Sequence, residues 1–203
     1  MDKARRLTRI QKRNREAILT AALEVFAAHG FRGATVDEIA TLAGLSKANL
    51  LYYFRSKEEI HRTLLDAQIE EWLAPLQAIS EDGEPLEELL AYMRCKLDMS
   101  RTHAKQSRLF ANAVVRGAEH IEAILSGRLK AVVDEKAALI ERWMDEGRIA
   151  KSDPYHLIFS FWAITQHYAD FEVQIHAVLG PDHDPITEAR PFAETLYRRL
   201  LTP

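Results

Sequence analysis

The stretch "TVDEIATLAGLSKANLLYYFRSKEEI", residues 35–60, contains two short helical patterns separated by a tight turn. Thr35 stands three residues before a glutamate, the spacing of a capping box, and therefore predicts the start of a short helix. Ser46 is a favourable N-cap for a second one. Because Gly44 permits the turn geometry between them, the spacing predicts a helix-turn-helix whose recognition helix begins after Ser46.

The side chains of this second helix suit double-stranded DNA. Its exposed N-terminal residues would meet base edges in the major groove, with Lys47 suited to guanine, Asn49 to adenine and Ala48 to a thymine methyl group. Phe54 is expected in the core. The residues expected to contact phosphates share a hydroxyl or an ammonium group, or lie at a helix N-terminus; they are Thr35, Ser46, Tyr52, Tyr53 and Lys57.

Charge is distributed unevenly along the chain, although the formal net charge is only −3. Residues 1–55 carry 10 Lys and Arg against 5 Asp and Glu, whereas residues 56–203 carry 17 against 25. A basic head on an acidic body is typical of a nucleic-acid reader with a separate second function. A solvated basic tail that binds nothing explains the charge equally well. Seven of the basic residues precede residue 16, and they are Lys3, Arg5, Arg6, Arg9, Lys12, Arg13 and Arg15.

Helical periodicity dominates the 203-residue chain, with a break at "SEDGEP", residues 80–85, and no alternating strand pattern, so the predicted class is all-α. A first helix is expected to stop at Gly30. Further helices are predicted at 56–79, 86–103, 105–115, 118–146, 154–179 and 188–201. We expect a DNA-binding domain at 1–56 and a ligand-binding and dimerisation domain at 57–203. The lack of a membrane-spanning apolar run or a secretory signal predicts a cytoplasmic protein.

The pattern of the predicted 154–179 helix suggests a ligand pocket. Tyr155, Phe159, Trp162 and Gln166 follow a three-to-four spacing and so share one face. A buried glutamine must find hydrogen bonds, and a planar ligand with paired carbonyl and N–H groups supplies two at once. Trp72 on the predicted 56–79 helix and Trp162 would clamp such a ring. The alternative is that these aromatic residues are core and that the glutamine bonds to backbone.

Few residues indicate catalysis or metal binding. Cys95 is the only cysteine, which excludes a cysteine-based zinc cluster and an internal disulfide, and it is expected to be a small half-buried thiol. No carboxylate pair or Ser/His/Asp set is recognisable, so no catalytic residue, cofactor or metal is expected. Asp170, His167 and Glu172 lie close in sequence and keep an enzyme as an alternative. A chromosome-organising protein of weak specificity is another.

The stretch quoted first resembles the signature of TetR-family transcriptional regulators over about 45 residues, from Ala17 to Ile60. The resemblance implies a three-helix DNA-binding head on a helical body that dimerises and binds a small effector. One departure is Leu51, where many members carry tyrosine, which would move a phosphate contact to Tyr52.

The body segments "EEWLAPL", "SRLF", "VDEKAALIERW" and "DPYHLIFSFWAITQHYADF" are similar to the pyrimidine-utilisation regulators of that family. This similarity implies a homodimer, paired through the last two helices, that leaves a palindromic operator when uracil or thymine binds. The segment "ANAVVRG" lacks the sulfur-rich residues expected there. A regulator of another metabolic or efflux pathway, with another effector, therefore remains an alternative.

Overall fold

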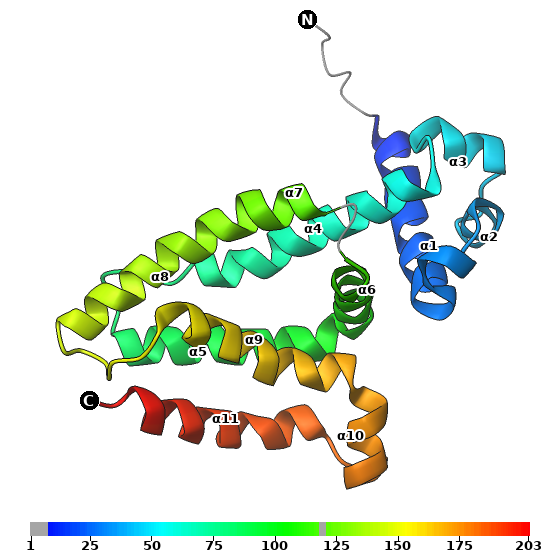
Figure 1. Cartoon of the computed structure of the whole chain (residues 1–203). Helices are drawn as coiled ribbons and strands as arrows, with labels where there is room; N and C mark the ends of the chain where they lie inside the picture. Colours follow the sequence, from blue (N-terminus) through cyan, green and yellow to red (C-terminus); the bar gives the residue numbers. More distant parts are fainter. Residues whose placement is uncertain (1–7, 118–120) are drawn as a thin grey trace, which may run out of the picture. The chain divides into compact units, whose positions relative to one another are not determined.

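The computed structural model describes residues 8–117 and 121–203, and its regular structure in these ranges is entirely helical, as predicted (Figure 1). Lys3, Arg5 and Arg6 lie outside the described residues, as does the predicted start of a helix at residue 118. The elements in chain order are α1 (Arg9–Gly33), α2 (Val36–Leu42), α3 (Lys47–Tyr53), α4 (Lys57–Gln77), α5 (Pro85–Thr102), α6 (Ala104–Val115), α7 (Glu122–Ile124), a π-helical turn η1 (Leu125–Leu129), α8 (Lys130–Asp145), α9 (Pro154–Asp170), α10 (Glu172–Leu179) and α11 (Pro185–Leu201).

The first of two compact units extends to Ala67 and contains α1, α2, α3 and the start of α4. Its helices begin where the sequence predicts, because Thr35 forms a reciprocal capping box and Ser46 accepts a bond from a backbone N–H of α3. The sequence predicted that the first helix stops at Gly30. Gly30 has a left-handed φ of 64° that kinks α1 there, and the helix then continues for one further turn to Gly33. Phe54 is fully buried, which confirms its predicted core role.

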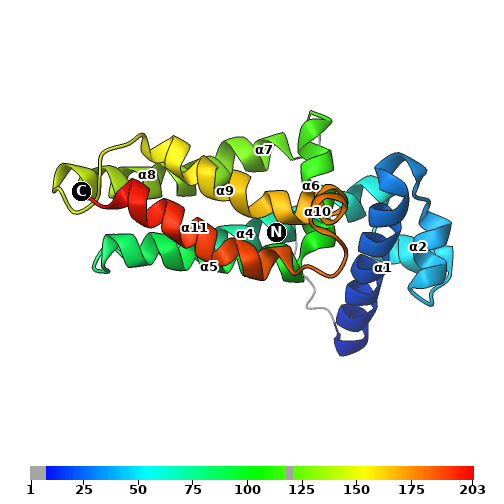
Figure 2. The same cartoon turned by 90° about the horizontal axis from the view of Figure 1, so that it is seen from below.

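The second unit, Gln68–Pro203, is built around α5, which packs against α9, α11 and α6. Figures 1 and 2 both show α5, α9 and α11 running side by side. Pro85 and Pro154 occupy first-turn positions of α5 and α9, where a missing N–H removes no helical bond. Trp143 on α8 is buried in the core, as expected.

The prediction of one continuous helix over residues 154–179 is wrong. The chain leaves helical geometry at Phe171, with φ −116° and ψ 27°, and this residue separates α9 from α10. Two side chains from α6 bind the end of α9: the Ser107 hydroxyl donates to the Asp170 carboxylate at 2.6 Å, and Arg108 donates to the Ala169 carbonyl at 2.9 Å. Because these contacts satisfy polar groups at the end of α9 from outside the helix, they stabilise the break.

The prediction of a regular helix over residues 118–146 also needs correction. A regular α-helix begins only at Lys130, after the π-helical turn η1. The Ser126 hydroxyl donates to the Glu122 carbonyl at 2.8 Å, and Gly127 follows it. A serine that bonds to the preceding turn and a glycine both weaken regular α-helix, so the sequence of this segment accounts for the irregular start.

The boundary between the compact units falls eleven residues beyond the predicted one at residue 56. The first turns of α4, which carry the buried Ile60 and Leu65, belong to the first unit. The division into a DNA-binding part and a ligand-binding and dimerisation part stays a prediction.

Candidate ligand pocket and nucleic-acid interface

The first three residues of α3 are exposed, as the DNA-reading role requires. Ser46 caps α3 by accepting a bond from the Asn49 N–H at 3.2 Å, and the side chains of Lys47, Ala48 and Asn49 are left to the solvent. A helix N-terminus that is capped and exposed can enter a major groove without rearranging the core. The structure is therefore compatible with the predicted base contacts.

The Lys47 ammonium is already paired on this surface. It lies 2.7 Å from the Asp37 carboxylate of α2, and both side chains are more than half exposed. Such exposed pairs contribute only about 0–1 kcal/mol. Lys47 can therefore exchange this partner for DNA at little cost.

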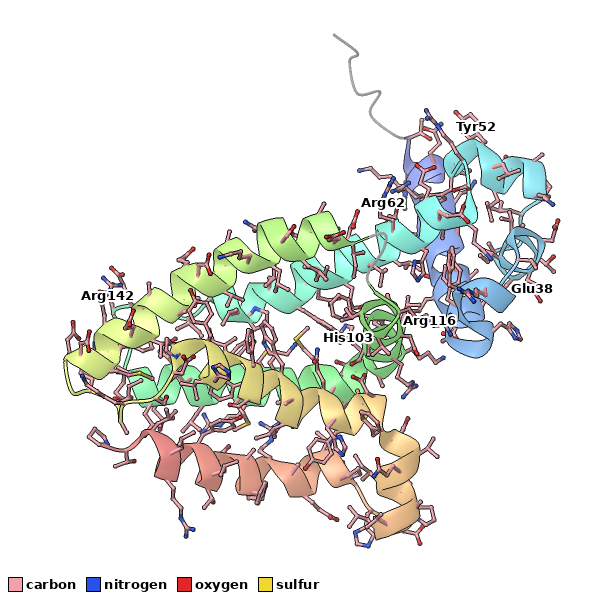
Figure 3. The ribbon with its side chains drawn as sticks, in the orientation of Figure 1. Glu38, Tyr52, Arg62, His103, Arg116 and Arg142 are labelled. Atoms are coloured by element: carbon pink, nitrogen blue, oxygen red, sulfur yellow. The ribbon has the colours of Figure 1, made fainter. Side chains whose placement is uncertain are left out.

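The two tyrosines at the end of α3 bond to α1. Tyr52 accepts a bond from the Gln11 side chain at 3.3 Å, and Tyr53 accepts one from Asn14 at 3.1 Å. Their rings meet edge to face, with centroids 5.2 Å apart. Tyr52 projects outward from α3 (Figure 3), whereas Tyr53 is half-buried, which matches a packed ring whose hydroxyl remains near the surface.

Thr35 and Lys57 both have intramolecular partners. The Thr35 hydroxyl donates to the Glu38 carboxylate at 2.8 Å, and this bond lowers the pKa of Glu38. The Lys57 ammonium donates to the Ala34 carbonyl at 2.7 Å and lies 4.7 Å from the centre of the Phe31 ring. Phosphate contacts by these two residues stay predictions, and Lys57 would have to share its donors between protein and DNA.

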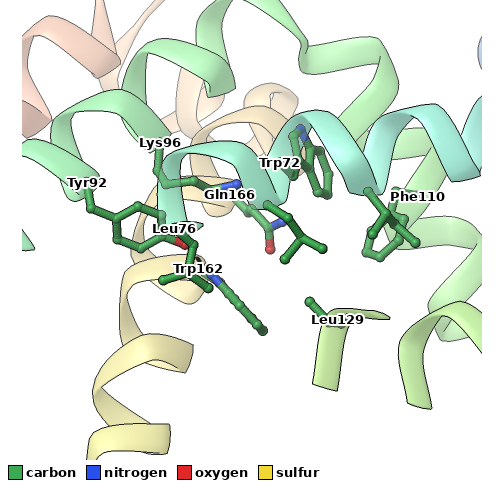
Figure 4. Close-up of a pocket in the computed structure, with 10 residues that line it drawn as sticks. Trp72, Leu76, Tyr92, Lys96, Phe110, Leu129, Trp162 and Gln166 are labelled. Carbon is green, nitrogen blue, oxygen red and sulfur yellow. Dashed lines mark hydrogen bonds between the residues drawn. The ribbon is translucent and has the colours of Figure 1, made fainter. Parts of the chain in front are cut away.

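A pocket lies within the second unit, between α4, α5, α6 and α9, with Leu129 of η1 at one side (Figure 4). Its cavity volume is about 80 Å³. Sites for drug-sized ligands usually measure roughly 300–1,000 Å³, so this one suits a compact ligand. The lining residues are mostly apolar or aromatic, and they are Ile69, Trp72, Leu73, Leu76, Tyr92, Lys96, Phe110, Leu129, Trp162 and Gln166.

The aromatic walls of the pocket are fixed by specific contacts. The Trp162 indole N–H donates to the Tyr92 hydroxyl at 2.7 Å, and burial raises the pKa of Tyr92. On the opposite side, Trp72 packs edge to face on Phe110, with ring centroids 5.0 Å apart. Since the indole N–H is already bonded, Trp162 offers a ligand its ring face rather than its donor.

Two polar side chains of the pocket carry unused hydrogen-bonding capacity. Within residues 8–117 and 121–203, no protein group bonds to the side-chain amide of Gln166, so the predicted alternative of a bond to backbone is not observed. Lys96 is only 3% exposed, and burial lowers its pKa to about 8, although Cys95 and Asp170 act in the opposite direction. Its ammonium lies 4.6 Å from the centre of the Trp72 ring.

Three of the four residues predicted for the pocket therefore come together, namely Trp72, Trp162 and Gln166. Phe159 does not line it, and this prediction needs correction: the ring is 45% exposed and packs on the outer side of Trp162, with centroids 5.4 Å apart. Phe159 shares a face with Gln166 but lies about 10 Å farther along the helix axis, beyond the end of the pocket. Tyr155 is farther still and donates to Asp134 at 3.1 Å.

Among the lining residues that sequence reasoning did not assign to the pocket, Lys96 and Tyr92 are the two with polar side-chain groups. They stand four residues apart on α5, on the same face as the buried Leu89, Met93 and Leu97. A lysine within an apolar helical stripe was the available signal.

The enzyme alternative rested on His167, Asp170 and Glu172, and each of these side chains has a separate partner in the structure. His167 stacks on Phe171 with centroids 5.0 Å apart, Asp170 accepts a bond from Ser107, and Glu172 pairs with Arg108 at 2.9 Å. None of the three lines the pocket. Cys95 is half-buried as expected, and burial raises the pKa of its thiol.

Among the described residues, no group of three or more His, Cys, Asp or Glu side chains could hold a metal ion. No helix in the described part of the chain is long and apolar enough to cross a membrane.

An apolar stripe on α11 is left uncovered in the single chain. Phe192, Leu196 and Leu200 follow one another at intervals of four residues and are all exposed, whereas Ala193, Tyr197 and Leu201 on the other side are buried. Exposed apolar residues aligned along one helix indicate a surface for another protein chain.

Two family models match the chain. Residues 18–63 match "Bacterial regulatory proteins, tetR family", and residues 65–202 match "YcdC-like protein, C-terminal region". The HTH-type transcriptional regulator RutR of Escherichia coli strain K12 is 49% identical over 166 residues, which are 82% of this chain and 78% of that protein.

Solved structures share the fold at lower identity. The crystal structure of AibR in complex with isovaleryl coenzyme A and operator DNA superposes with a TM-score of 0.72 at 23% identity, covering 94% of this chain and 99% of the other. The fatty acid degradation regulator FadR from Bacillus halodurans gives 0.66 at 20% identity, covering 91% and 94%.

Proposed function

The chain belongs to the TetR family of ligand-responsive, DNA-binding transcriptional regulators, and we propose that it binds a palindromic operator as a homodimer and releases it when uracil or thymine binds. The relatives that it resembles are named as regulators of transcription. The observation that carries the effector assignment is the unpaired Gln166 amide in a small pocket with indole rings of Trp72 and Trp162 in its wall.

The pocket chemistry supports a pyrimidine base. A side-chain amide has one acceptor oxygen and two donors, and it matches the adjacent carbonyl and N–H groups of uracil or thymine. Trp72 and Trp162 provide flat apolar surface for the ring. No hydrogen bond joins the half-buried Gln166 amide to another described residue, so a complementary ring can form two hydrogen bonds with it.

The cavity volume argues against the larger effectors of the family. AibR, which shares the fold, has been crystallised in complex with isovaleryl coenzyme A. A cavity of about 80 Å³ cannot enclose a coenzyme A thioester without a large rearrangement. Isovaleryl coenzyme A is therefore a suitable negative control.

The DNA-binding proposal rests on the exposed start of α3 and on the basic residues of α1. Lys47, Ala48 and Asn49 would read bases, while Ser46, Tyr52 and Tyr53 would contact phosphates through a helix N-terminus and hydroxyls. Thr35 and Lys57 would contact phosphates at the start of α2 and α4. Since a TetR-type operator is palindromic, a twofold homodimer would place one α3 on each half-site.

The homodimer proposal rests on the exposed stripe of Phe192, Leu196 and Leu200 on α11. With the neighbouring helix α9, it would form a four-helix interface with the same pair from a second copy. Such an arrangement covers the apolar stripe and generates the twofold axis that a palindromic site requires.

Calorimetric titration with uracil, thymine and adenine tests the effector, followed by the same ligands added to a protein–operator complex. We expect both pyrimidines to bind and to release the DNA, and adenine to do neither. Gln166→Ala should bind the operator with wild-type affinity but no longer respond to the pyrimidines, because the amide contacts the ligand and not the DNA. A normal response of this variant would show that the site is misplaced.

A further inference from the structure

Two side-chain amides of α1 reach the tyrosine hydroxyls at the end of α3. The Gln11 amide nitrogen donates to the Tyr52 oxygen at 3.3 Å, and the Asn14 amide nitrogen donates to the Tyr53 oxygen at 3.1 Å. Gln11 and Asn14 are three residues apart and therefore lie on one face of α1. Each hydroxyl that is proposed to contact a phosphate thus already accepts a hydrogen bond from another helix.

The direction of the Gln11 bond is fixed by the N-terminal cap of α1. Gln11 belongs to a capping box, and its amide oxygen accepts from the Thr8 backbone N–H at 2.9 Å. A backbone N–H can only donate, so the amide oxygen must face Thr8 and the amide nitrogen must face Tyr52. The Tyr52 oxygen consequently accepts this bond, and its own proton has to point elsewhere.

These bonds prepare the hydroxyls to meet an acceptor. A phenolic hydroxyl carries one proton and can both donate and accept, whereas a phosphodiester oxygen only accepts. An amide N–H on the acceptor side turns the hydroxyl proton away from α1, and it also strengthens the bond that this proton can form. Tyr52 is 67% exposed and Tyr53 is half-buried, so the turned protons can reach a ligand at the surface. The edge-to-face contact of the two rings, with centroids 5.2 Å apart, restrains both side chains.

We propose that Gln11 and Asn14 are positioning residues of the DNA interface, which orient the Tyr52 and Tyr53 hydroxyls to donate to phosphate oxygens of the DNA backbone. This inference rests on the proposed phosphate contacts of the two tyrosines and adds the residues that make them donors. Neither amide has to touch the DNA for this effect. Because a phosphate contact carries no base information, the amides should affect all bound sequences alike.

The first test is Asn14→Asp, which keeps the shape of the side chain and replaces its N–H donor by an acceptor. The Tyr53 proton would then bond to the new carboxylate and turn away from the DNA, so the affinity for DNA should fall. The probe is a fluorescein-labelled duplex selected from a random-sequence pool by binding to the wild type. Fluorescence anisotropy at fixed salt gives the affinities.

Tyr53→Phe separates the hydroxyl effect from the added negative charge. In this background Asn14→Asp still repels DNA, but it has no hydroxyl to turn, so the cycle of two single variants and the double variant isolates the hydroxyl. We expect the loss caused by Asn14→Asp to be about 2- to 12-fold larger when Tyr53 is present, the range for one hydrogen bond. Equal losses in both backgrounds would overturn the role of Asn14.

Gln11→Glu is the parallel test for Tyr52. A glutamate keeps an oxygen for the Thr8 N–H and therefore keeps the capping box, but it removes the donor to Tyr52. Its loss of affinity should be larger in the wild-type background than in Tyr52→Phe. The crossed pair, Gln11→Glu with Tyr53→Phe, is the control and should show a smaller coupling. A crossed coupling as large as the direct one would overturn the assignment of one amide to each hydroxyl.

A second measurement distinguishes positioning from a merely structural role. The carboxylate of Asn14→Asp accepts from the Tyr53 hydroxyl, so a bond between α1 and α3 remains and urea unfolding should change little. Neutral methylphosphonate groups placed one at a time along the duplex should identify a phosphate at which the wild type loses affinity and Asn14→Asp loses less. The same methylphosphonate profile for both proteins would overturn the positioning role.

The outcomes separate this inference from the proposed function. If the wild type selects no duplex from the pool, the DNA-binding proposal fails, and this inference fails with it. If Tyr52→Phe and Tyr53→Phe both bind the selected duplex as the wild type does, the phosphate contacts of the tyrosines are wrong, while the other DNA contacts stand. If the tyrosine variants bind weakly but show no coupling to Gln11 or Asn14, the positioning role alone is overturned.

Discussion

The pair between Lys47 and Asp37 allows the DNA-reading role of α3 to be tested by strengthening the binding as well as by weakening it. The Lys47 ammonium lies 2.7 Å from the Asp37 carboxylate, and the two side chains are 55% and 64% exposed. If Lys47 must leave Asp37 to reach a base, removal of the Asp37 charge should raise the affinity of the protein for its operator. Asp37→Asn should therefore bind the operator more tightly than the wild type.

The magnitude follows from the exposure of the pair. Exposed pairs contribute about 0–1 kcal/mol, so the gain in operator affinity has a ceiling of roughly fivefold. Asp37 also lies in the first turn of α2, where a negative charge stabilises the helix by about 0.3–1 kcal/mol. The unfolding free energy should consequently fall slightly while the affinity rises. Lys47→Met should weaken operator binding by about 1–3 kcal/mol and relax the preference for guanine at one position.

Fluorescence anisotropy with a labelled operator at fixed salt would measure these affinities for the wild type, both single variants and the double variant. We expect no effect of Asp37→Asn in the Lys47→Met background, because the pair is then already broken. An equal gain in that background would mean that Asp37 acts only through general repulsion of DNA. Weaker binding of Asp37→Asn alone would refute the reasoning, since Asp37 would then hold Lys47 in its reading position.

Two further predictions concern the body. Tyr92→Phe should lower the free energy of unfolding, measured in urea, by about 1–3 kcal/mol, because the Trp162 indole N–H loses its acceptor. Tyr168→Phe is the control and should have little effect, because the Tyr168 hydroxyl has no hydrogen bond in the described part of the chain. Leu196→Glu places a charge in the exposed stripe of α11 and should therefore convert the dimer to monomers in sedimentation experiments and weaken operator binding. If this variant remains dimeric, the dimer interface is not on this stripe.

Local signals in the sequence predicted most of the first unit. The Thr35 capping box, the Ser46 cap and the left-handed Gly44 at the turn each depend on neighbours within a few residues. Such features are encoded where they occur, so periodicity and capping rules identify them. The break at Phe171 was not predictable in this way, because the Ser107 and Arg108 contacts that stabilise it come from another helix.

The candidate pocket illustrates the same limit in its chemistry. The spacing of Trp162 and Gln166 identified the face of α9 that lines the cavity. It could not show where along that face the cavity ends, and Phe159, which was expected there, lies outside it. A lysine is usually solvated, so the sequence alone did not single out Lys96 despite its place in a buried stripe. Whether the buried face of α5 meets packed side chains or a cavity depends on the spacing of α4, α5 and α9, which the sequence does not state. Lys96 was therefore visible in the sequence only as a conflict between charge and periodicity, and such conflicts are where functional residues are expected.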